Sequence, residues 1–454
     1  MNQLEQPKVS TMGFVIKITV VAALGGLLFG YDTAVIAGAI GFLKIKFDLS
    51  PVMVGWVASS AIWGCIAGSI TAGYLSDRIG RKKVLIITAV LFAVSSAGTA
   101  IPNNLTQFII SRFIGGLGIG GASMLSPLYI SEISPAKIRG KLVSVYQLAI
   151  VFGINIIYFV NLRIASLGND AWKVEHGWRY MFASGLIPSA LFLVLLFLVP
   201  ESPRWLIKNN RLKEAFSVLE KLNGKKEAVE VAKEIQLALV HETGTIKEFF
   251  QPGMRKAMIV GGVLALFSQI TGINAIIYYA PEIFKSVGFG SDSALLQTVI
   301  IGFVNTIFTF VAISFIDRLG RKTLLLGGVT GMILSLLGTA ACFYFHLTGA
   351  WLVMFIVIYI ACFAASLGPI PWVIISEIFP TKTRGIAMSF CTCVLWIGVL
   401  LITQFTPVLL KGLGGAGTFG IFMINAIILL VFTWKRIPET KQKTLEEIEL
   451  SWEK

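Results

Sequence analysis

The sequence places two opposite charges inside segments that are otherwise apolar. Asp32 is the only charged residue in the 26 residues from Ile18 to Leu43, and Arg112 is the only one in the run 106–130. Helices over these runs would place both charges on the order of 10–17 Å from the same membrane face, at a rise of about 1.5 Å per residue. An isolated charge at that depth costs several kcal/mol, so we expect the two to pair or to face a water-filled cavity.

Such a pair suits proton chemistry. Asp32 would take up a proton when it is open to one side of a membrane and release it on the other, while Arg112 alternately pairs with the carboxylate and lets it go. The residues alone leave a purely structural ion pair open as the alternative.

The composition indicates which class of protein would hold this pair. The 454 residues are 56% hydrophobic and 14% charged, whereas soluble proteins have roughly 45–50% apolar and about 25% charged residues. One soluble core cannot hide that apolar excess, so we expect a membrane protein. Five cysteines in apolar runs and three scattered histidines suggest no disulfide framework, metal site or cofactor.

Twelve apolar runs are long enough to cross a membrane as helices. They lie near 18–43, 52–75, 84–102, 106–130, 142–162, 180–199, 257–284, 294–316, 324–345, 350–374, 386–410 and 416–434. We therefore predict an all-α membrane protein with twelve transmembrane helices in two groups of six. The charged segment 201–255 between them is typical of short amphipathic helices that form a cytoplasmic linker.

The Lys and Arg residues are distributed unevenly between the two sides of this arrangement. With the N-terminus inside, 30 of the 38 fall in cytoplasmic loops and tails, 7 fall in the opposite loops, and Arg112 lies within a helix. The positive-inside rule then predicts a multi-pass protein of the cell membrane with both termini in the cytoplasm. The net charge of +14 follows from this topology, so nucleic-acid binding is not expected.

Three motifs recur at nearly one offset. GYLSDRIGRKK (73–83) matches SFIDRLGRKT (314–323), SEISPAKIRGK (131–141) matches SEIFPTKTRGI (376–386), and PESPRW (200–205) matches PETKQKT (438–444). The offsets of 240, 245 and 238 residues indicate a duplicated six-helix unit. We predict a first half over 1–200, the linker over 201–255, and a second half with a short tail over 256–454.

The repeated motifs place acids and arginines at helix ends on the cytoplasmic side, where they can form networks between helices. The expected members are Asp77, Arg78, Arg81, Glu132, Arg139, Glu201, Arg204, Asp317, Arg321, Glu377 and Arg384. Such a network would lock the two halves together on that side. The positive-inside rule explains the basic residues but not the duplicated acids.

These motifs, with SQITGINAIIYYAPEIF (268–284) and GPIPWVIISEIFPTKTRG (368–385), resemble the sugar porter family of the major facilitator superfamily over nearly the whole chain. The resemblance implies alternating access, with a hexose or pentose bound between the two six-helix halves. The sugar site that it implies consists of Gln147, Ile150, Gln269, Asn274, Asn305 and Trp372, with Trp396 as a second aromatic wall and Tyr278 and Tyr279 as a gate.

These residue types suit a sugar. Carboxamides donate and accept hydrogen bonds as sugar hydroxyls do, and an aromatic ring suits the C–H face of the sugar. Ser268, Ile154 and Leu395 stand where relatives in the family carry glutamine, so the site is expected to be less polar than theirs.

The pair of Asp32 and Arg112 matches the proton-coupled members of the family, whereas its facilitators usually carry a neutral residue in place of Asp32. The sequence therefore predicts a monomeric sugar–proton symporter whose partners are a monosaccharide, protons and the lipid bilayer. A sugar uniporter and an inositol or polyol symporter are the alternatives. An enzyme is not expected, because no paired carboxylates, nucleophile triad or metal ligands converge in the helices.

Overall fold

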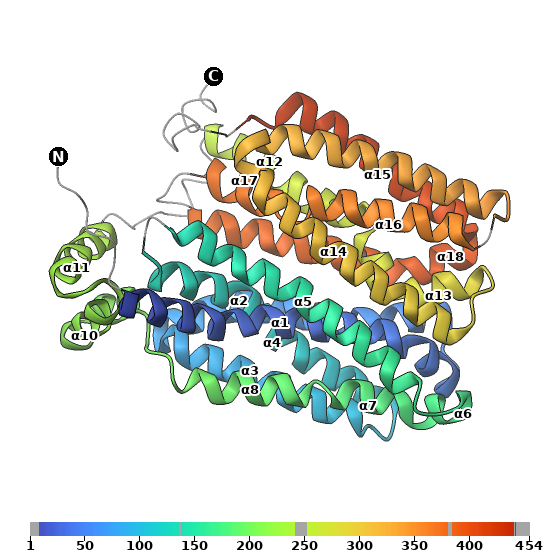
Figure 1. The fold of residues 1–454 in the computed structure, drawn as a ribbon, viewed down its shortest axis with the longest axis horizontal. Coiled ribbons are helices and arrows are strands. Elements are labelled where there is room, and N and C mark those ends of the chain that lie inside the picture. Colours follow the sequence, from blue (N-terminus) through green and yellow to red (C-terminus); the bar gives the residue numbers. More distant parts are fainter. Residues whose placement is uncertain are drawn as a thin grey trace.

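The computed structural model describes residues 9–135, 138–240, 252–347, 349–379, 384–439 and 441. The regular structure in these ranges is helical throughout, and the long helices run side by side in one bundle (Figure 1). Eleven segments of the described chain are long and apolar enough to cross a membrane, and the last of them, at 50 residues, is long enough for two crossings. The predicted fold class is therefore confirmed.

The first half, as the name is used below, is the part of the bundle before the linker. Its helices are α1 (Val9–Lys46), α2 (Pro51–Ile79), α3 (Arg81–Ala100), α4 (Leu105–Ile133), α5 (Arg139–Ala165), α6 (Asp170–Trp172), the π-helix η2 (Lys173–Gly177), α7 (Trp178–Ala183) and α8 (Leu186–Leu196). The pieces from α6 to α8 together form the sixth span, which begins ten residues before the predicted start at 180.

The second half is the part of the bundle after the linker. Its helices are α12 (Pro252–Ile270), α13 (Ile273–Ser286), α14 (Ser291–Leu319), α15 (Arg321–Tyr344), α16 (Ala350–Ala365), α17 (Ile370–Ile378) and α18 (Arg384–Arg436). Non-helical backbone at Gly414, with φ of 67°, interrupts α18 and separates the last two predicted spans. The division of the chain into domains at residues 200 and 255 stays a prediction.

Two predicted spans of the second half are broken within the membrane. The run 257–284 is interrupted between α12 and α13, and the run 350–374 between α16 and α17. Pro369 stands at the second break, where its ring removes a backbone N–H that a continuous helix would need. Apolar content alone could not reveal these breaks, because both flanks of each one are hydrophobic.

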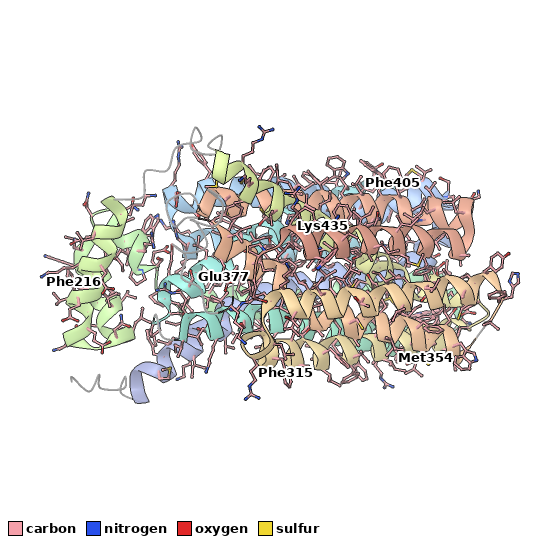
Figure 2. All side chains as sticks on the ribbon, turned by 90° about the horizontal axis from the view of Figure 1, so that it is seen from above. Phe216, Phe315, Met354, Glu377, Phe405 and Lys435 are labelled. Atoms are coloured by element: carbon pink, nitrogen blue, oxygen red, sulfur yellow. The ribbon has the colours of Figure 1, made fainter. Side chains whose placement is uncertain are left out.

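The linker contains α9 (Pro203–Lys208), α10 (Leu212–Asn223) and α11 (Lys225–Val240). Its amphipathic helices share a small apolar core of their own, which includes Trp205 and Leu219. The linker lies at one end of the bundle beside the start of α1, as Figure 1 and the position of Phe216 in Figure 2 show. We call this the linker end, and the other the opposite end.

Glycine sets how closely the first-half helices approach one another. Gly116 of α4 lies so near Gly64 and Ala61 of α2 that a Cβ atom would not fit. Small residues at such crossings let membrane helices pack by close backbone contact. This packing places Arg112, one turn before Gly116, in the interior of the half. Large apolar side chains such as Phe315, Met354 and Phe405 instead lie on the outer surface of the bundle (Figure 2).

Candidate functional site

The structure brings Asp32 of α1 and Arg112 of α4 into direct contact. The Nη1 group of Arg112 donates to Oδ2 of Asp32 at 2.9 Å and to the Asp32 backbone oxygen at 3.3 Å. Arg112 is fully buried, and Asp32 is 8% exposed. A buried guanidinium needs a counter-charge, since removal of one partner from a buried pair costs roughly 3–5 kcal/mol.

The surroundings of this pair leave several polar atoms without partners in the described part of the chain. They include Nε and Nη2 of Arg112 and the hydroxyl of Ser95. Ser95 and the Asp32 carboxylate both lie against the α-carbon face of Gly115, where the absent side chain leaves room for them. A small cleft within the first half also reaches Asp32 and has Ser96 and Ser189 among its other lining residues. The carboxylate therefore has hydroxyl groups of the first half in its surroundings.

Tyr278 and Tyr279 of α13, the predicted gate, are both buried. Tyr278 lies beside Thr33 of α1, within electrostatic range of the Asp32–Arg112 pair. The hydroxyl of Tyr279 donates to the backbone oxygen of Thr403 on α18 at 2.7 Å. The gate helix therefore packs against α1, which carries Asp32, and is also bonded to α18 of its own half.

The break between α12 and α13 is supported by two side chains that the sequence analysis missed. Gly272 takes φ of 103°, a conformation that favours glycine. The hydroxyl of Tyr359 donates to the backbone oxygen of Thr271 at 3.0 Å. The side-chain amide of Asn425 donates to the backbone oxygen of Ile270 at 2.9 Å. Unwound backbone is tolerated in a membrane where protein groups satisfy it. The Thr-Gly dipeptide was the available signal in the sequence.

The amides predicted to bind sugar meet at this break. The Nδ2 group of Asn274 donates to Oε1 of Gln269 at 2.7 Å, and Gln269 in turn donates to the Ser268 hydroxyl at 3.1 Å. Gly398 of α18 packs against Gln269. Two residues earlier, the buried indole of Trp396 has no hydrogen-bond partner for its N–H in the described structure. Discontinuous helices of this kind form substrate sites in secondary transporters.

A contact between two aromatic rings connects this region to α1 of the first half, which is itself closely packed on α5. The rings of Trp396 and Phe29 of α1 lie 5.5 Å apart. The next residue of α1, Gly30, packs against the backbone of Ile150 on α5. Ile150 lies one turn after Gln147, and the side chains of Gln147 and Ile150 are both half-buried. Phe29 was not predicted, since one phenylalanine among 32 carries no distinguishing signal.

The remaining predicted sugar residues are less closely tied to this group. Asn305 is buried on α14, one turn after Gly302, which packs on Asn155 of α5. Trp372 lies on α17 with 36% of its surface exposed. Within the described residues, the structure gives Trp372 no hydrogen bond or ring contact with the other predicted sugar residues.

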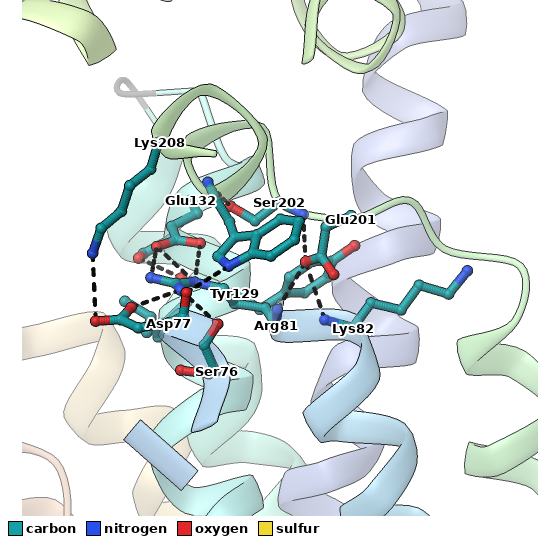
Figure 3. A network of polar contacts seen from close by, with 12 residues as sticks. Ser76, Asp77, Arg81, Lys82, Tyr129, Glu132, Glu201, Ser202 and Lys208 are labelled. Atoms are coloured by element: carbon teal, nitrogen blue, oxygen red, sulfur yellow. Dashed lines mark hydrogen bonds and ion pairs between the residues drawn. The ribbon is translucent and has the colours of Figure 1, made fainter. Parts of the chain in front are cut away.

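At the linker end, Arg81 is the centre of the charge network in the first half (Figure 3). Its guanidinium donates to Glu132 of α4, at 3.1 Å from Nε to Oε2, and to Asp77 of α2 at 2.8 Å. The carboxylate of Glu201 accepts from the backbone N–H groups of Arg81 and Lys82 at 2.9 and 3.1 Å, and so caps the start of α3.

The second half repeats this arrangement. Arg321 pairs with Glu377 at 3.1 Å, and Glu439 accepts from the N–H groups of Arg321 and Lys322, each at 3.0 Å. Gly80 and Gly320 occupy equivalent turns with φ of 103° and 91°. Glu439 was not among the predicted members, although its PET motif matched the PES motif of Glu201.

Other predicted members of the network have different surroundings. The guanidinium of Arg78 lies over the Tyr74 ring at 4.3 Å. Arg139 is exposed and has no ion pair with any residue that the structure describes, while Arg204 is half-buried and has an interaction partner. The side chains of Asp317 and Arg384 lie outside the described residues. The ion pairs of the two paragraphs above each join helices of one half, and none of them bridges the halves.

At the opposite end, several contacts do cross between the halves. The hydroxyl of Ser59 on α2 donates to Oε1 of Gln404 on α18 at 2.6 Å. Lys285 of α13 lies over the Phe42 ring of α1 at 5.3 Å. Lys173 of η2 pairs with Asp292 of α14 at 2.9 Å. The halves are therefore in contact at this end.

Known proteins share this sequence over almost its full length. A family model described as "Sugar (and other) transporter" matches residues 18–452. The chain belongs to this family. Its resemblance to the sugar porters is thereby confirmed, and it is a multi-pass membrane transporter and not an enzyme.

Individual relatives are similar in sequence and in structure. The arabinose-proton symporter of Bacillus subtilis (strain 168) is 46% identical, covering 97% of this chain and 96% of that protein. The D-xylose-proton symporter of Escherichia coli (strain K12) is 40% identical over 97% of this chain and 96% of that protein. The partially occluded inward-open structure of the xylose transporter from E. coli superimposes with a TM-score of 0.86, at 40% identity, and covers 95% of this chain and 100% of that one.

Proposed function

We propose that this protein is a sugar–proton symporter of the cell membrane that moves a hexose or pentose by alternating access. The observation that carries the proposal is the buried Asp32–Arg112 pair of the first half. It occurs together with paired amides at a broken helix of the second half and a ring contact between the halves. The relatives described as arabinose- and xylose-proton symporters support the same assignment.

The amides are suited to recognising a neutral polyol. Gln269 and Asn274 can exchange their mutual hydrogen bond for bonds to sugar hydroxyls, and we propose that the half-buried Gln147 of the first half supplies a further amide. The rings of Phe29 and Trp396 offer an apolar wall, and the free indole N–H of Trp396 offers a further donor. A ligand held by both halves can favour one relative placement of the halves over another.

Asp32 is the proposed proton carrier. In its charged form the carboxylate holds Arg112; after protonation it no longer neutralises the guanidinium, whose remaining N–H groups must then find other acceptors or water. Tyr278 and Asn274 lie on the same helix, α13, which packs against the helix that carries Asp32. Proton binding and sugar binding would thus act on one gate.

We further propose that the linker end faces the cytoplasm, together with both termini, and that the transporter works as a monomer. The distribution of Lys and Arg favours this orientation. The contacts between the halves at the opposite end then correspond to an inward-facing state. In the outward-facing state, the charge networks at the linker end would come together across the two halves.

The decisive experiment compares accumulation with counterflow in proteoliposomes. A panel of labelled pentoses, hexoses and inositol first identifies a transported sugar. Asp32→Asn should then abolish accumulation under an imposed proton gradient but retain counterflow, because the amide is nearly isosteric and cannot ionise. Asp48→Asn, at an exposed position after α1, is the matched control and should retain both activities.

Each alternative outcome has a definite meaning. If the Asp32→Asn variant still concentrates sugar, proton coupling through Asp32 is wrong. If the wild type exchanges sugar but never exceeds the equilibrium ratio, the protein is a uniporter. If only inositol or another polyol is carried, the assignment to a hexose or pentose fails.

A further inference from the structure

We propose that Lys173 is an electrostatic latch that holds the two halves together at the opposite end, and that its release from Asp292 is a step in opening that end. This inference rests on the proposed function, because it describes one step of alternating access. The motifs of the sequence and the names of the relatives do not point to this residue.

The geometry of Lys173 sets it apart from other charges at that end. Its ammonium group donates to Asp170 at 3.0 Å and to Asp292 at 2.9 Å. Its side chain is only 6% exposed, whereas those of Asp170 and Asp292 are 83% and 64% exposed. A buried ammonium depends on its partners for the solvation that it has lost, so each carboxylate matters more here than at an open surface.

The two carboxylates belong to different parts of the molecule. Asp170 lies three residues before Lys173 in the same half, so this pair persists however the halves move. Asp292 lies in the first turn of α14 in the second half, where the helix N-terminus also favours its negative charge. Only the pair with Asp292 must break when the halves separate. Asp170 then keeps the ammonium neutralised, so the latch can open without leaving a bare buried charge.

Lys173 is presented by a rigid part of the first half. The side chain of Asn169 accepts from the Trp172 N–H at 2.9 Å and so caps the helix that leads into η2. The indole N–H of Trp178 donates to the oxygen of Val174 at 3.0 Å, and the fully buried ring of Trp178 packs against Phe108 of α4. Because the backbone that carries Lys173 is fixed to the core, the ion pair can transmit force between the halves.

The test measures the separation of the halves directly. Spin labels are attached at Ile101→Cys and Phe345→Cys, two exposed positions after α3 and α15 at the opposite end, with the five native cysteines replaced. Asp292→Asn should raise the ratio of separated to closed molecules at least about threefold, as expected for a lost ion pair. Asp170→Asn removes an equal charge from the same lysine but breaks a pair within one half, so it should not raise this ratio.

A double variant checks that the effect passes through Lys173. Lys173→Met alone should open the halves as Asp292→Asn does, and the combined variant should open them no further. The latch is overturned if Asp292→Asn fails to shift the distribution, if Asp170→Asn shifts it equally, or if the two effects add. Failure of the proposed function is distinct, since it would appear as absence of sugar counterflow in the wild type and leave these distances unaffected.

Discussion

Replacement of Tyr359 by phenylalanine tests whether the broken segment between α12 and α13 organises the sugar site. The change removes one hydroxyl, which donates to the backbone oxygen of Thr271 at 3.0 Å. Both residues are fully buried, so water cannot replace the lost donor in the folded protein. Tyr359→Phe should therefore destabilise the geometry that places Asn274 beside Gln269.

The size of the expected loss of sugar affinity follows from the energy of one buried hydrogen bond. Interhelical hydrogen bonds in membrane proteins average about 0.6 kcal/mol, and a buried polar group left unsatisfied costs about 1–3 kcal/mol. If sugar binding requires the broken segment in its present geometry, the dissociation constant rises about threefold at the lower limit and about a hundredfold at the upper limit. Titration calorimetry on folded protein measures this rise.

Tyr129→Phe is the matched control. The Tyr129 hydroxyl also donates to a backbone oxygen, that of Pro200 at 2.6 Å, and its side chain is also fully buried, but it lies at the linker end of the first half. Both variants should lower the unfolding midpoint, and only Tyr359→Phe should weaken sugar binding. A wild-type dissociation constant in Tyr359→Phe, or equal weakening in both variants, would refute the reasoning.

Three further predictions follow from particular contacts. Asn274→Ala should weaken sugar binding by roughly tenfold or more, because a buried sugar hydroxyl loses its partner; an unchanged dissociation constant would remove this residue from the site. Glu439→Ala should lower the unfolding midpoint more than Glu439→Gln, which keeps one acceptor for the helix that it caps. Gly115→Ala should push the Ser95 side chain out of its place near the Asp32 carboxylate and reduce accumulation more than counterflow. Gly118→Ala, on the same helix with more room, should leave the ratio of the two activities as in the wild type.

Much of the bundle could be predicted from the sequence, because the membrane reduces the problem to one dimension. Apolar runs of sufficient length must be helices, and depth along a helix is a count of residues. Asp32 and Arg112 therefore could be expected to meet, since two opposite charges at equal depth have a strong reason to pair. The duplicated motifs likewise predicted duplicated networks, and Arg81 with Glu132 and Arg321 with Glu377 take equivalent places.

The breaks in the helices could not be predicted from the lengths and depths of the apolar runs. Whether the backbone at Thr271 and Gly272 can leave the helix depends on donors supplied by Tyr359, 88 residues away from Thr271, and by Asn425, 155 residues away from Ile270. Neither side chain is distinguishable in the sequence from a tyrosine or asparagine that merely packs between helices. The orientation of the amides at the predicted sugar site depends on these distant partners.

Lys173 shows most clearly which contacts the sequence predicts and which ones only the tertiary structure decides. Its pairing with Asp170 is local, because two residues three positions apart on a helical turn stay close together in any arrangement of the bundle. Its pairing with Asp292, 119 residues away, exists only because the two halves meet at the opposite end. The sequence by itself determined the apolar spans, their order and the charges that each one carries. Tertiary structure decided which charges face each other across the interface, since the relative placement of two halves that move in the transport cycle is a property of neither half alone.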